Sequence, residues 1–355
     1  MIIQNKSSST YIHEKSSLAT QHNSVYYSFN GINVARPDLF LKNNRRLFES
    51  LDIANVEGFD LICFDNCLES NTNCIDFIYD KFIIKLGIPE NKINFIGSSI
   101  DYKQIILETA NLYNKRPINC EAYLHWEKDS QNYFPKVNDK LVPITRNINN
   151  ITKKYINFTR VWRKHRIELL NYLYENNLFD VGYNSISNDI NHMSSDKLHS
   201  DLYKRLPLTI DTNQFMKPLG HNTNGGEQLK LLNFFNSSVF SVVTESNFDE
   251  YNVRFLTEKT FKPMIFKHSF ILAGQYKSLE YIRQLGYKTF SPYINEDYDN
   301  ISDSKERLKA IQTEIHRLCS LTKEETIIFL QNVQEIVDHN YQTLLNKQNF
   351  LYRVS

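Results

Sequence analysis

The sequence has no excess of either charge, since 41 lysine and arginine residues stand against 40 aspartate and glutamate residues. The resulting net charge of +1 argues against a nucleic-acid-binding protein, whose affinity rests on many contacts to phosphate groups. One small anionic ligand in a local basic pocket is still compatible with this balance. The 355 residues are 41% hydrophobic, which is ample for a packed core, and the length favours two domains.

Cysteine is also scarce in this chain. The count is odd, and no two cysteines have the Cys-x-x-Cys spacing of a zinc knuckle. We therefore expect reduced thiols in the core, with neither a disulfide framework nor a structural zinc site. The five residues are Cys63, Cys67, Cys74, Cys120 and Cys319.

Long hydrophobic runs are missing as well. The longest, such as residues 61–64, fall far short of the roughly 20 apolar residues that span a bilayer. The opening residues are polar and lack the apolar segment of a signal peptide. We expect no integral membrane segment and a cytoplasmic location, and peripheral association with a membrane is left open. Residues 1–22 are rich in serine and threonine and predict a disordered tail.

Strand and helix patterns alternate in the first half of the chain. Short apolar runs predict strands at residues 59–65 and 93–97, and helical spacing of apolar residues predicts helices at 73–86 and 101–113. Such alternation indicates a parallel sheet with helices on its faces. We expect residues 23–148 to form an N-terminal α/β domain that ends at a polar, Asn-rich stretch.

The same alternation continues in the second half, so we expect a C-terminal α/β domain at residues 149–320. A Thr-x-x-Glu capping box at residues 322–325 predicts the start of a last helix, within a helical segment at 321–355. The predicted strands are residues 155–158, 239–243 and 270–273, and the predicted helices are 164–178, 258–267, 277–285 and 304–318.

One group of polar residues follows the predicted strand at 239–243. Glu245 and Asn247 come just after this strand, at the edge where open α/β sheets bind their ligands. A helix is predicted to start beside Thr257, and its free N–H groups favour a phosphate. Lys259 adds a positive charge in the first turn, which is unfavourable for the helix alone and therefore indicates a functional site. Either Glu245 or Glu258 can accept hydrogen bonds from ribose hydroxyls.

A plainer interpretation of this group is equally open on spacing alone. Glu258 is then a carboxylate that stabilises a helix start, and Lys259 is a solvated surface charge.

A second group is basic and follows the predicted strand at 155–158. Its cations crowd the junction between that strand and a helix, where an anion is favoured, and the arginine fork suits bidentate contact with phosphate. A solvated helix face is the plainer alternative. The candidates are Arg160, Arg163, Lys164, His165 and Arg166.

The stretch ESN…Y…FLTEKTFKPMIFKHSFILAG, within residues 245–274, resembles the signature of the alpha-1,3-fucosyltransferase family. Residues 157–185 and 278–311 are similar to exostosin-like and fucosyltransferase-like proteins of phages and bacteria. The resemblance covers roughly residues 155–315. It implies the GT-B arrangement, two Rossmann-like domains facing a cleft, and an inverting, metal-independent glycosyltransferase.

The resemblance also implies roles for individual residues. Glu245, Glu258 and Lys259 match the family pattern and would hold the ribose and phosphates of a nucleotide-sugar donor. Asn247 stands one place later than the family's asparagine, and Tyr251 matches only with extra residues before Thr257. The acceptor, a glycan or another hydroxyl compound, would bind the N-terminal domain, which supplies a carboxylate base.

Asp65 and Glu69 are the candidates for that base, because they lie at the end of a predicted strand, although either is also an ordinary loop carboxylate. The Asp-x-Asp at residues 297–299 is interpreted as a loop element, and we expect no metal or other cofactor.

The main alternative is a non-catalytic nucleotide- or glycan-binding protein that keeps this fold. A structural or partner-binding protein is a third class, and it would show no affinity for nucleotides.

Overall fold

The structure is a computed structural model. It describes residues 24–28, 60–67, 70, 72–138, 140–159, 161–186, 197–208, 226–249 and 253–353. These residues form an α/β protein with parallel sheets, as the alternating pattern predicts. The predicted tail at residues 1–22 lies outside the described part. Within the described ranges, no helix combines the length and the hydrophobicity needed to cross a bilayer.

The chain divides into two compact units, which we describe separately. Described residues of Met1–Lys128, Asn252–Phe255 and Gln348–Ser355 form the first unit, and those of Asp129–Tyr251 and Leu256–Lys347 form the second. The division falls after Lys128, so the boundary expected near residue 148 lies inside the second unit.

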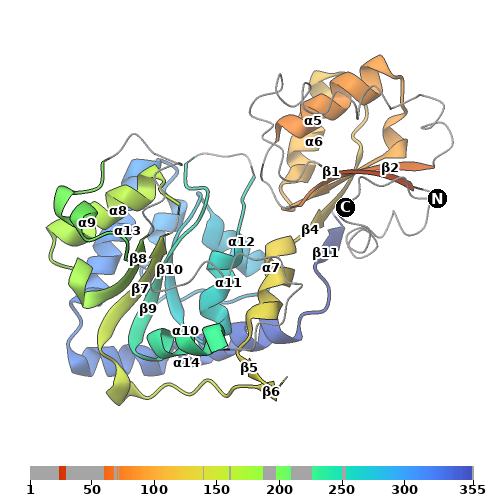
Figure 1. The fold of residues 1–355 in the computed structure, drawn as a ribbon. Helices are drawn as coiled ribbons and strands as arrows, with labels where there is room; N and C mark the ends of the chain where they lie inside the picture. Colours follow the sequence, from red (N-terminus) through yellow and green to blue (C-terminus); the bar gives the residue numbers. More distant parts are fainter. Residues whose placement is uncertain are drawn as a thin grey trace. The chain divides into compact units, whose positions relative to one another are not determined.

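The first unit is built on a five-stranded sheet in the order β1-β2-β3-β4-β11. Strands β1 to β4 are parallel, and β11 joins β4 in the antiparallel direction. Figure 1 shows α5 and α6 together over this sheet. The strands are β1 (Ser24–Ser28), β2 (Leu61–Asn66), β3 (Ile93–Gly97), β4 (Asn119–Tyr123) and β11 (Leu351–Arg353). The helices are α5 (Asn73–Ile78), the π-helix η1 (Tyr79–Lys85), the 3-10 helix η2 (Glu90–Lys92) and α6 (Tyr102–Leu112).

Alternate residues of β2 and β3 face the two sides of this sheet, as expected for strands. Ile62 pairs with Ile93, and both belong to a buried cluster with the apolar faces of α5, η1 and α6. Val253 belongs to the same cluster, and the guanidinium of Arg254 binds the carboxylate of Asp101 at 2.6 Å. These contacts explain why a short segment from late in the chain belongs to the first unit.

The second unit is built on a parallel four-stranded sheet in the order β10-β9-β7-β8. The strands are β7 (Lys153–Thr159), β8 (Gly182–Ile186), β9 (Ser238–Thr244) and β10 (Ser269–Ala273). A small hairpin of β5 (Lys136–Val137) and β6 (Lys140–Leu141) precedes them. Every residue of β9 is buried, as expected for a central strand that is covered on both faces.

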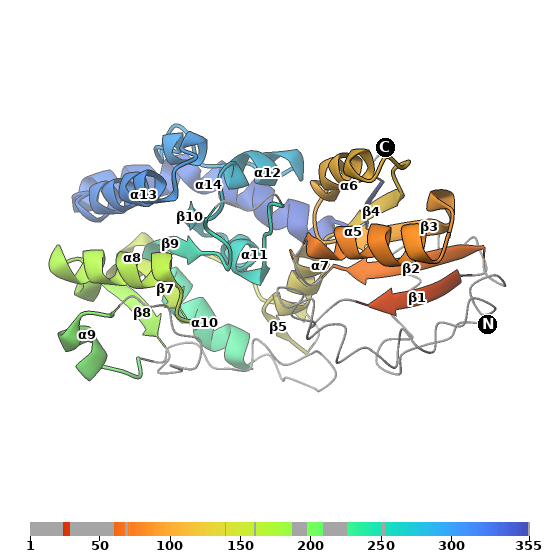
Figure 2. The same cartoon turned by 90° about the horizontal axis from the view of Figure 1, so that it is seen from above.

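Helices cover both faces of this second sheet. Figures 1 and 2 agree in placing α8 on one side of the strands and α11 on the other. The helices of this unit are α8 (Lys164–Glu175), α9 (Ser200–Lys204), α10 (Gly226–Asn236), α11 (Glu258–Ile265), α12 (Ser278–Gln284), α13 (Ser304–Cys319) and α14 (Lys323–Asn346). Short 3-10 segments are η3 (Gln131–Tyr133), η4 (Ile148–Asn150), η5 (Phe179–Val181) and η8 (Asp297–Asn300), and α7 (His125–Ser130) contains the division between the units.

The capping box predicted at the start of α14 is confirmed. The hydroxyl of Thr322 accepts a hydrogen bond from the N–H of Glu325, and the carboxylate of Glu325 accepts one from the N–H of Thr322. This reciprocal pair satisfies two N–H groups that the helix itself cannot satisfy. The start of the longest described helix is therefore fixed by local sequence.

Candidate functional site

The topology of the second sheet points to one position on its edge. The chain leaves β7 toward β8 on one side, and it later leaves β9 toward β10 on the other side. Ligands of open α/β sheets bind at the carboxyl ends of the strands where the connections diverge in this way. In this sheet the position lies between the ends of β7 and β9, at Thr159 and Thr244.

Glu245 follows β9 directly and is completely buried. Its Oε1 accepts hydrogen bonds from the N–H of Thr257 at 2.9 Å and from the hydroxyl of Thr260 at 2.6 Å. Its Oε2 accepts from the hydroxyl of Thr257 at 2.7 Å and from the N–H of Ser246 at 3.1 Å. A carboxylate has about four acceptor positions, so protein groups already occupy those of Glu245. Its role here is to position the start of α11 rather than to hold a ribose.

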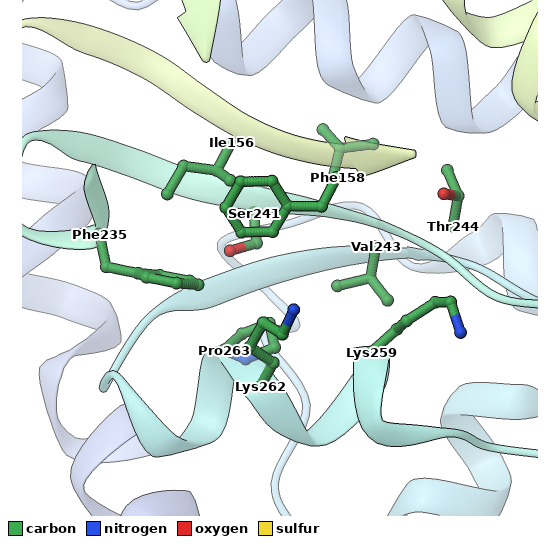
Figure 3. A pocket seen from close by; sticks show the side chains of 10 residues that line it. Ile156, Phe158, Phe235, Ser241, Val243, Thr244, Lys259, Lys262 and Pro263 are labelled. Carbon is green, nitrogen blue, oxygen red and sulfur yellow. The ribbon is translucent and has the colours of Figure 1, made fainter. Parts of the chain in front are cut away.

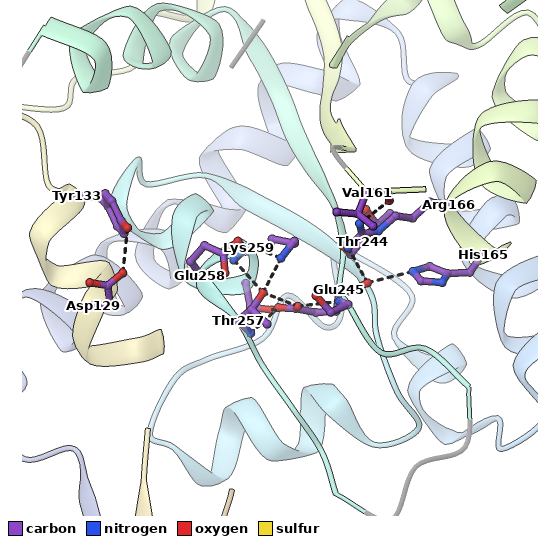
Figure 4. A network of polar contacts seen from close by, with 12 residues as sticks. Asp129, Tyr133, Val161, His165, Arg166, Thr244, Glu245, Thr257, Glu258 and Lys259 are labelled. Carbon is purple, nitrogen blue, oxygen red and sulfur yellow. Dashed lines mark hydrogen bonds and ion pairs between the residues drawn. The ribbon is translucent and has the colours of Figure 1, made fainter. Parts of the chain in front are cut away.

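The first turn of α11 carries the Thr-Glu-Lys element. Thr257 is the N-cap residue, as predicted, and its hydroxyl accepts from the N–H of Lys259. The ammonium of Lys259 donates to that hydroxyl at 3.0 Å and to Oε1 of Glu258 at 2.9 Å. Figure 4 shows this chain of contacts running from Glu245 to Glu258. Lys259 is therefore tied to the helix start and is not a freely solvated charge.

The carboxyl of Glu258 stays ionised at neutral pH. Its burial raises the pKa, but the nearby charge of Lys259, the hydrogen bond from it and the charge of Lys262 together bring the pKa below its ordinary value. One carboxylate and two ammonium groups thus occupy the first turns of α11. The surplus of positive charge there suits a bound anion.

The basic residues after β7 differ in burial and in their contacts. Arg163 is the N-cap residue of α8, is exposed, and makes no side-chain cap, while Arg160 lies outside the described residues. Arg166 is buried and donates to the carbonyl groups of Val161, Thr244 and Glu245 at 2.7–2.9 Å.

His165 and Arg166 share the carbonyl group of Glu245, which Nε2 of His165 meets at 3.1 Å. Because a carbonyl only accepts, this contact assigns the proton to Nε2. Burial, helped by the charge of Arg166, lowers the pKa of His165 to about 3, so this ring is neutral. Burial also lowers the pKa of Arg166 to about 10, and the guanidinium remains charged at neutral pH.

Lys259 and the described members of the basic group lie near the same strand end, but they line no common pocket there, because the pocket that contains Lys259 includes none of the basic group. Figure 4 shows His165 and Arg166 reaching the end of β9 from one side and Thr257 and Lys259 from the other. The nitrogens of His165 and Arg166 that make these contacts bind the protein itself. Of the described members of the basic group, Arg163 and Lys164 at the start of α8 carry exposed side chains.

Within the described part of the chain, two buried polar atoms at this edge have no hydrogen-bond partner. They are the hydroxyl of Thr244 and the Nε–H of Arg166. Thr244 lies on the opposite face of β9 from Glu245, because successive side chains of a strand alternate, and that is the face covered by α8. A buried polar group without a partner costs roughly 1–3 kcal/mol. Such groups are rare enough in native proteins to indicate a water or ligand site.

The pocket beside these residues is small, about 30 Å³. Figure 3 shows Lys259 and Lys262 rising from α11 toward β7 and β9, with Phe158 above them. The ammonium of Lys262 lies 5.2 Å from the centre of the Phe158 ring. Pockets that enclose whole ligands measure roughly 300–1,000 Å³, so this one accounts for a part of a ligand at most.

The remaining predicted residues are placed as follows. Asp65 belongs to β2 in the first unit, is buried, and accepts from the N–H of Cys67 at 2.9 Å. Asn247 is half-buried in the loop after β9. Glu69 and Tyr251 lie outside the described residues.

One titratable residue near this edge was not predicted as a site residue. Asp129 accepts a hydrogen bond from the hydroxyl of Tyr133 at 2.9 Å, and its carboxyl feels the charge of Glu258. Burial chiefly raises the pKa of Asp129, the bonds from Tyr133 and Asn132 lower it, and Glu258 raises it further. In the sequence, Asp129 lies near other acidic residues, but their spacing is not that of metal ligands, so no pattern marks it as a site residue. Its proximity to Glu258 results from the packing of η3 on α11.

The Asp-x-Asp at residues 297–299 has a structural use. The carboxylate of Asp299 accepts from the N–H groups of Leu279 and Glu280, at 2.9 and 3.0 Å, in the first turn of α12. Throughout the described ranges, no group of three or more His, Cys, Asp or Glu side chains is arranged to hold a metal ion. Asp299 therefore acts as a helix-start acceptor.

No protein-family model matches the chain, and no curated protein matches it.

Proposed function

We propose that the chain is a glycosyltransferase that moves a sugar from a nucleotide-sugar donor to a glycan or another hydroxyl acceptor. The observation that carries the proposal is the pairing of two helix starts, those of α8 and α11, at the point where the connections of β7 and β9 diverge. Both first turns carry cations, although a helix start by itself favours anions. A diphosphate bound between them would resolve this conflict, as phosphates do at other helix starts.

In this proposal the donor diphosphate lies against Lys259 and the N–H groups of the two helix starts. Glu258, the buried neighbour of Lys259 in the first turn of α11, accepts hydrogen bonds from the ribose. Glu245 and Arg166 are positioning residues, because their polar atoms fix the end of β9 and the start of α11. Positive charge at this point would stabilise the diphosphate as it leaves.

An inverting, metal-independent reaction is part of the proposal and follows the family resemblance. It needs a base that takes a proton from the acceptor hydroxyl as that oxygen attacks the anomeric carbon. Glu69 and Asp65 remain sequence-based candidates, although Asp65 is buried and already bonded to its own loop. Asp129 is a further candidate, since its raised pKa moves it toward the range in which a carboxylate is an effective base.

The proposal extends to the domain organisation. Each unit contains its own mainly parallel sheet, as the GT-B architecture requires, with the second unit as the donor-binding domain and the first as the acceptor-binding domain.

The test is a thermal-shift screen of the full chain against GDP, UDP, CMP and their sugar derivatives. A ligand at 100 times its dissociation constant stabilises the folded protein by roughly 2.7 kcal/mol. We expect one nucleotide series to raise the melting temperature, and Lys259→Met to abolish this rise. The control is Lys309→Met, which also removes an ammonium that is paired with a glutamate, on the exposed face of α13.

Transfer is then measured with the nucleotide sugar that binds. Absence of stabilisation by every nucleotide would contradict the proposal. Binding without hydrolysis or transfer would favour the non-catalytic nucleotide-binding alternative.

A further inference from the structure

A second cavity lies at the opposite edge of the second sheet, beside the amino ends of β7 and β9. Its volume is about 470 Å³, within the range of roughly 300–1,000 Å³ that is typical of small-molecule sites. It is lined by η4, η5, the first residues of β7 and β9, and the first turns of α14. Figure 1 shows α14 running along this end of the strands.

Three lysines line this cavity: Lys153, Lys154 and Lys323. In the described part of the chain, none of the three forms an ion pair with a carboxylate. The ammonium of Lys153 donates to the carbonyl group of Asp180 at 2.6 Å. The ammonium of Lys154 donates to the carbonyl group of Leu321 and to the hydroxyl of Thr326.

The acidic residues close by are already engaged. The carboxylate of Asp180, which is the acidic residue of the lining, receives two hydrogen bonds from Arg205, the shorter at 2.6 Å. The carboxylate of Glu325 receives the N–H of Thr322 in the capping box and does not line the cavity. The lining thus carries three ammonium groups and one carboxylate, and that carboxylate is shared between Arg205 and the charge of Lys153, so positive charge remains in surplus.

Five apolar residues line the cavity besides the lysines, together with the polar Asn149, Thr152 and Thr326. The apolar residues are Ile148, Ile151, Val181, Val239 and Ile327. An ion as small as phosphate would leave most of such a space empty, whereas an apolar group would remove these side chains from water. The lining therefore favours a ligand that carries both a negative charge and an apolar group.

We propose that this cavity binds a small organic anion, a carboxylate or phosphate monoester that carries an apolar group. The hydrogen bonds that Lys153 and Lys154 donate to main-chain carbonyl groups explain the presence of these two lysines. They do not account for Lys323, an exposed residue whose side chain makes no hydrogen bond in the described part of the chain, or for the volume between the three lysines. The site is separate from the candidate donor site, and the proposal does not depend on glycosyl transfer.

The experiment uses anilinonaphthalene sulfonate, a fluorescent aromatic anion, titrated into the full chain. We expect one saturable site, with displacement of the probe by octanoate if the ligand is a carboxylate and by phenyl phosphate if it is a phosphate monoester. The double variant Lys153→Met/Lys154→Met should lose at least about tenfold in affinity, since each charge-assisted contact contributes roughly 1.5–3 kcal/mol. The control is Lys305→Met, an exposed lysine of α13 outside the cavity lining.

Two further variants keep the test valid if the double variant folds poorly. Lys323→Glu reverses a charge on an exposed side chain, and Val181→Trp fills the mouth of the cavity without changing its charge. Both should weaken probe binding while the melting temperature stays near that of the parent. Unchanged affinity in both variants, displacement of the probe by GDP or UDP, or no saturable binding would each overturn the proposal.

Discussion

Strand β9 is held at both ends by the same kind of pair, an arginine and a neutral histidine, although Arg166 is buried and Arg146 is half-buried. At the amino end, Arg146 donates to the carbonyl groups of the first two residues of the strand, and His268 bonds the first of them at 3.1 Å. At the carboxyl end, Arg166 donates to the carbonyl groups of the last residue and of the one that follows, and His165 bonds the latter. The two ends of one strand therefore allow a direct comparison.

The two ends differ in how the arginine charge is compensated. Burial lowers the pKa of Arg146 to about 9, and no carboxylate opposes this effect. Burial also lowers the pKa of Arg166, but Glu245 and Glu258 raise it, and it settles at about 10. Positive charge at the carboxyl end is thus partly balanced inside the protein, whereas the amino end, with its three lysines, remains cationic.

The largest expected effect comes from removing each arginine in turn. Arg166→Met leaves the carbonyl groups of Val161, Thr244 and Glu245 without their buried donor and removes a positive charge that Glu245 and Glu258 favour. We expect a loss of about 3–5 kcal/mol of unfolding free energy, the usual result of breaking a buried charge arrangement. Arg146→Met removes hydrogen bonds but also an uncompensated charge on a half-buried side chain, so we expect only about 1–2 kcal/mol.

Urea denaturation of both variants at neutral pH measures this difference. Equal losses would show that the glutamates do not matter to Arg166, and a larger loss for Arg146→Met would reverse the comparison.

The next effect concerns the carboxylate that fixes the start of α11. In Glu245→Gln, the side-chain amide turns one acceptor oxygen into a donor, which then faces the N–H of Ser246 or of Thr257. A hydroxyl can rotate to accept instead, but an N–H cannot. We expect a loss of about 2–3 kcal/mol, from one stranded N–H and one weakened bond.

The matched control is Glu306→Gln in the first turn of α13, an exposed glutamate paired with Lys309. Such surface pairs contribute about 1 kcal/mol or less. If Glu245→Gln unfolds at the same urea concentration as this control, Glu245 is not the anchor of α11.

A third effect is a pH dependence that both ends of β9 share. His165 and His268 are neutral when folded, because burial, supported by the nearby arginine, lowers the pKa of each well below 6.5. Below pH 6.5 the unfolded chain binds a proton at each position that the folded chain does not bind. Stability is therefore complete above pH 6.5 and falls with falling pH, by about 1.4 kcal/mol per pH unit for each histidine. For His165 this window extends down to about pH 3.

Unfolding free energies measured between pH 4 and 6 test this dependence. His165→Gln and His268→Gln should each reduce the slope by about one proton, and the exposed His316→Gln serves as the control. A slope that stays the same in either buried variant would mean that the histidine is already protonated in the folded protein.

Much of the fold follows from local patterns in the sequence. The start of α11 at Thr257 and the capping box of α14 were predicted from a few adjacent residues, since caps act over short distances. Pro263 lies inside α11 without displacing that start. Strands β4 and β8 were not predicted, because their polar residues, such as Glu121 and Asn184, interrupt the apolar pattern.

The site was predicted only in part, because burial is a property of tertiary packing. Glu245 and Glu258 were identified as one group after the strand predicted at 239–243, and Arg166 as part of a second group after the strand predicted at 155–158. The structure brings Arg166 to the end of β9, beside Glu245. The burial of all three side chains, and the use of Glu245 and Arg166 to position the end of β9 and the start of α11, was not predictable. It depends on contacts such as that between Glu245 and Thr260, 15 positions apart, and on the packing that buries Arg166.

Glu258→Gln is expected to change the structure least, and it tests most directly whether a nucleotide binds at the carboxyl end of β9. The variant keeps the shape of the side chain and loses its charge next to Lys259, so we expect a stability change within about 1 kcal/mol. If Glu258 holds the ribose, the affinity for the nucleoside diphosphate should fall about tenfold, because a charge-assisted hydrogen bond is weakened. Affinity for inorganic pyrophosphate should not fall, since the ammonium of Lys259 loses a competing anion.

The matched control for this variant is Glu280→Gln, which changes another first-turn glutamate paired with a lysine, in α12. Calorimetric titration with the nucleotide and with pyrophosphate separates the possible outcomes. A fall in both affinities would indicate that the substitution disturbs the whole helix start, and α11 would then be the feature that matters. Unchanged affinity for the nucleotide would assign Glu258 to helix stabilisation alone. The difference between the two ends of β9 would then be one of charge balance and not of ligand binding.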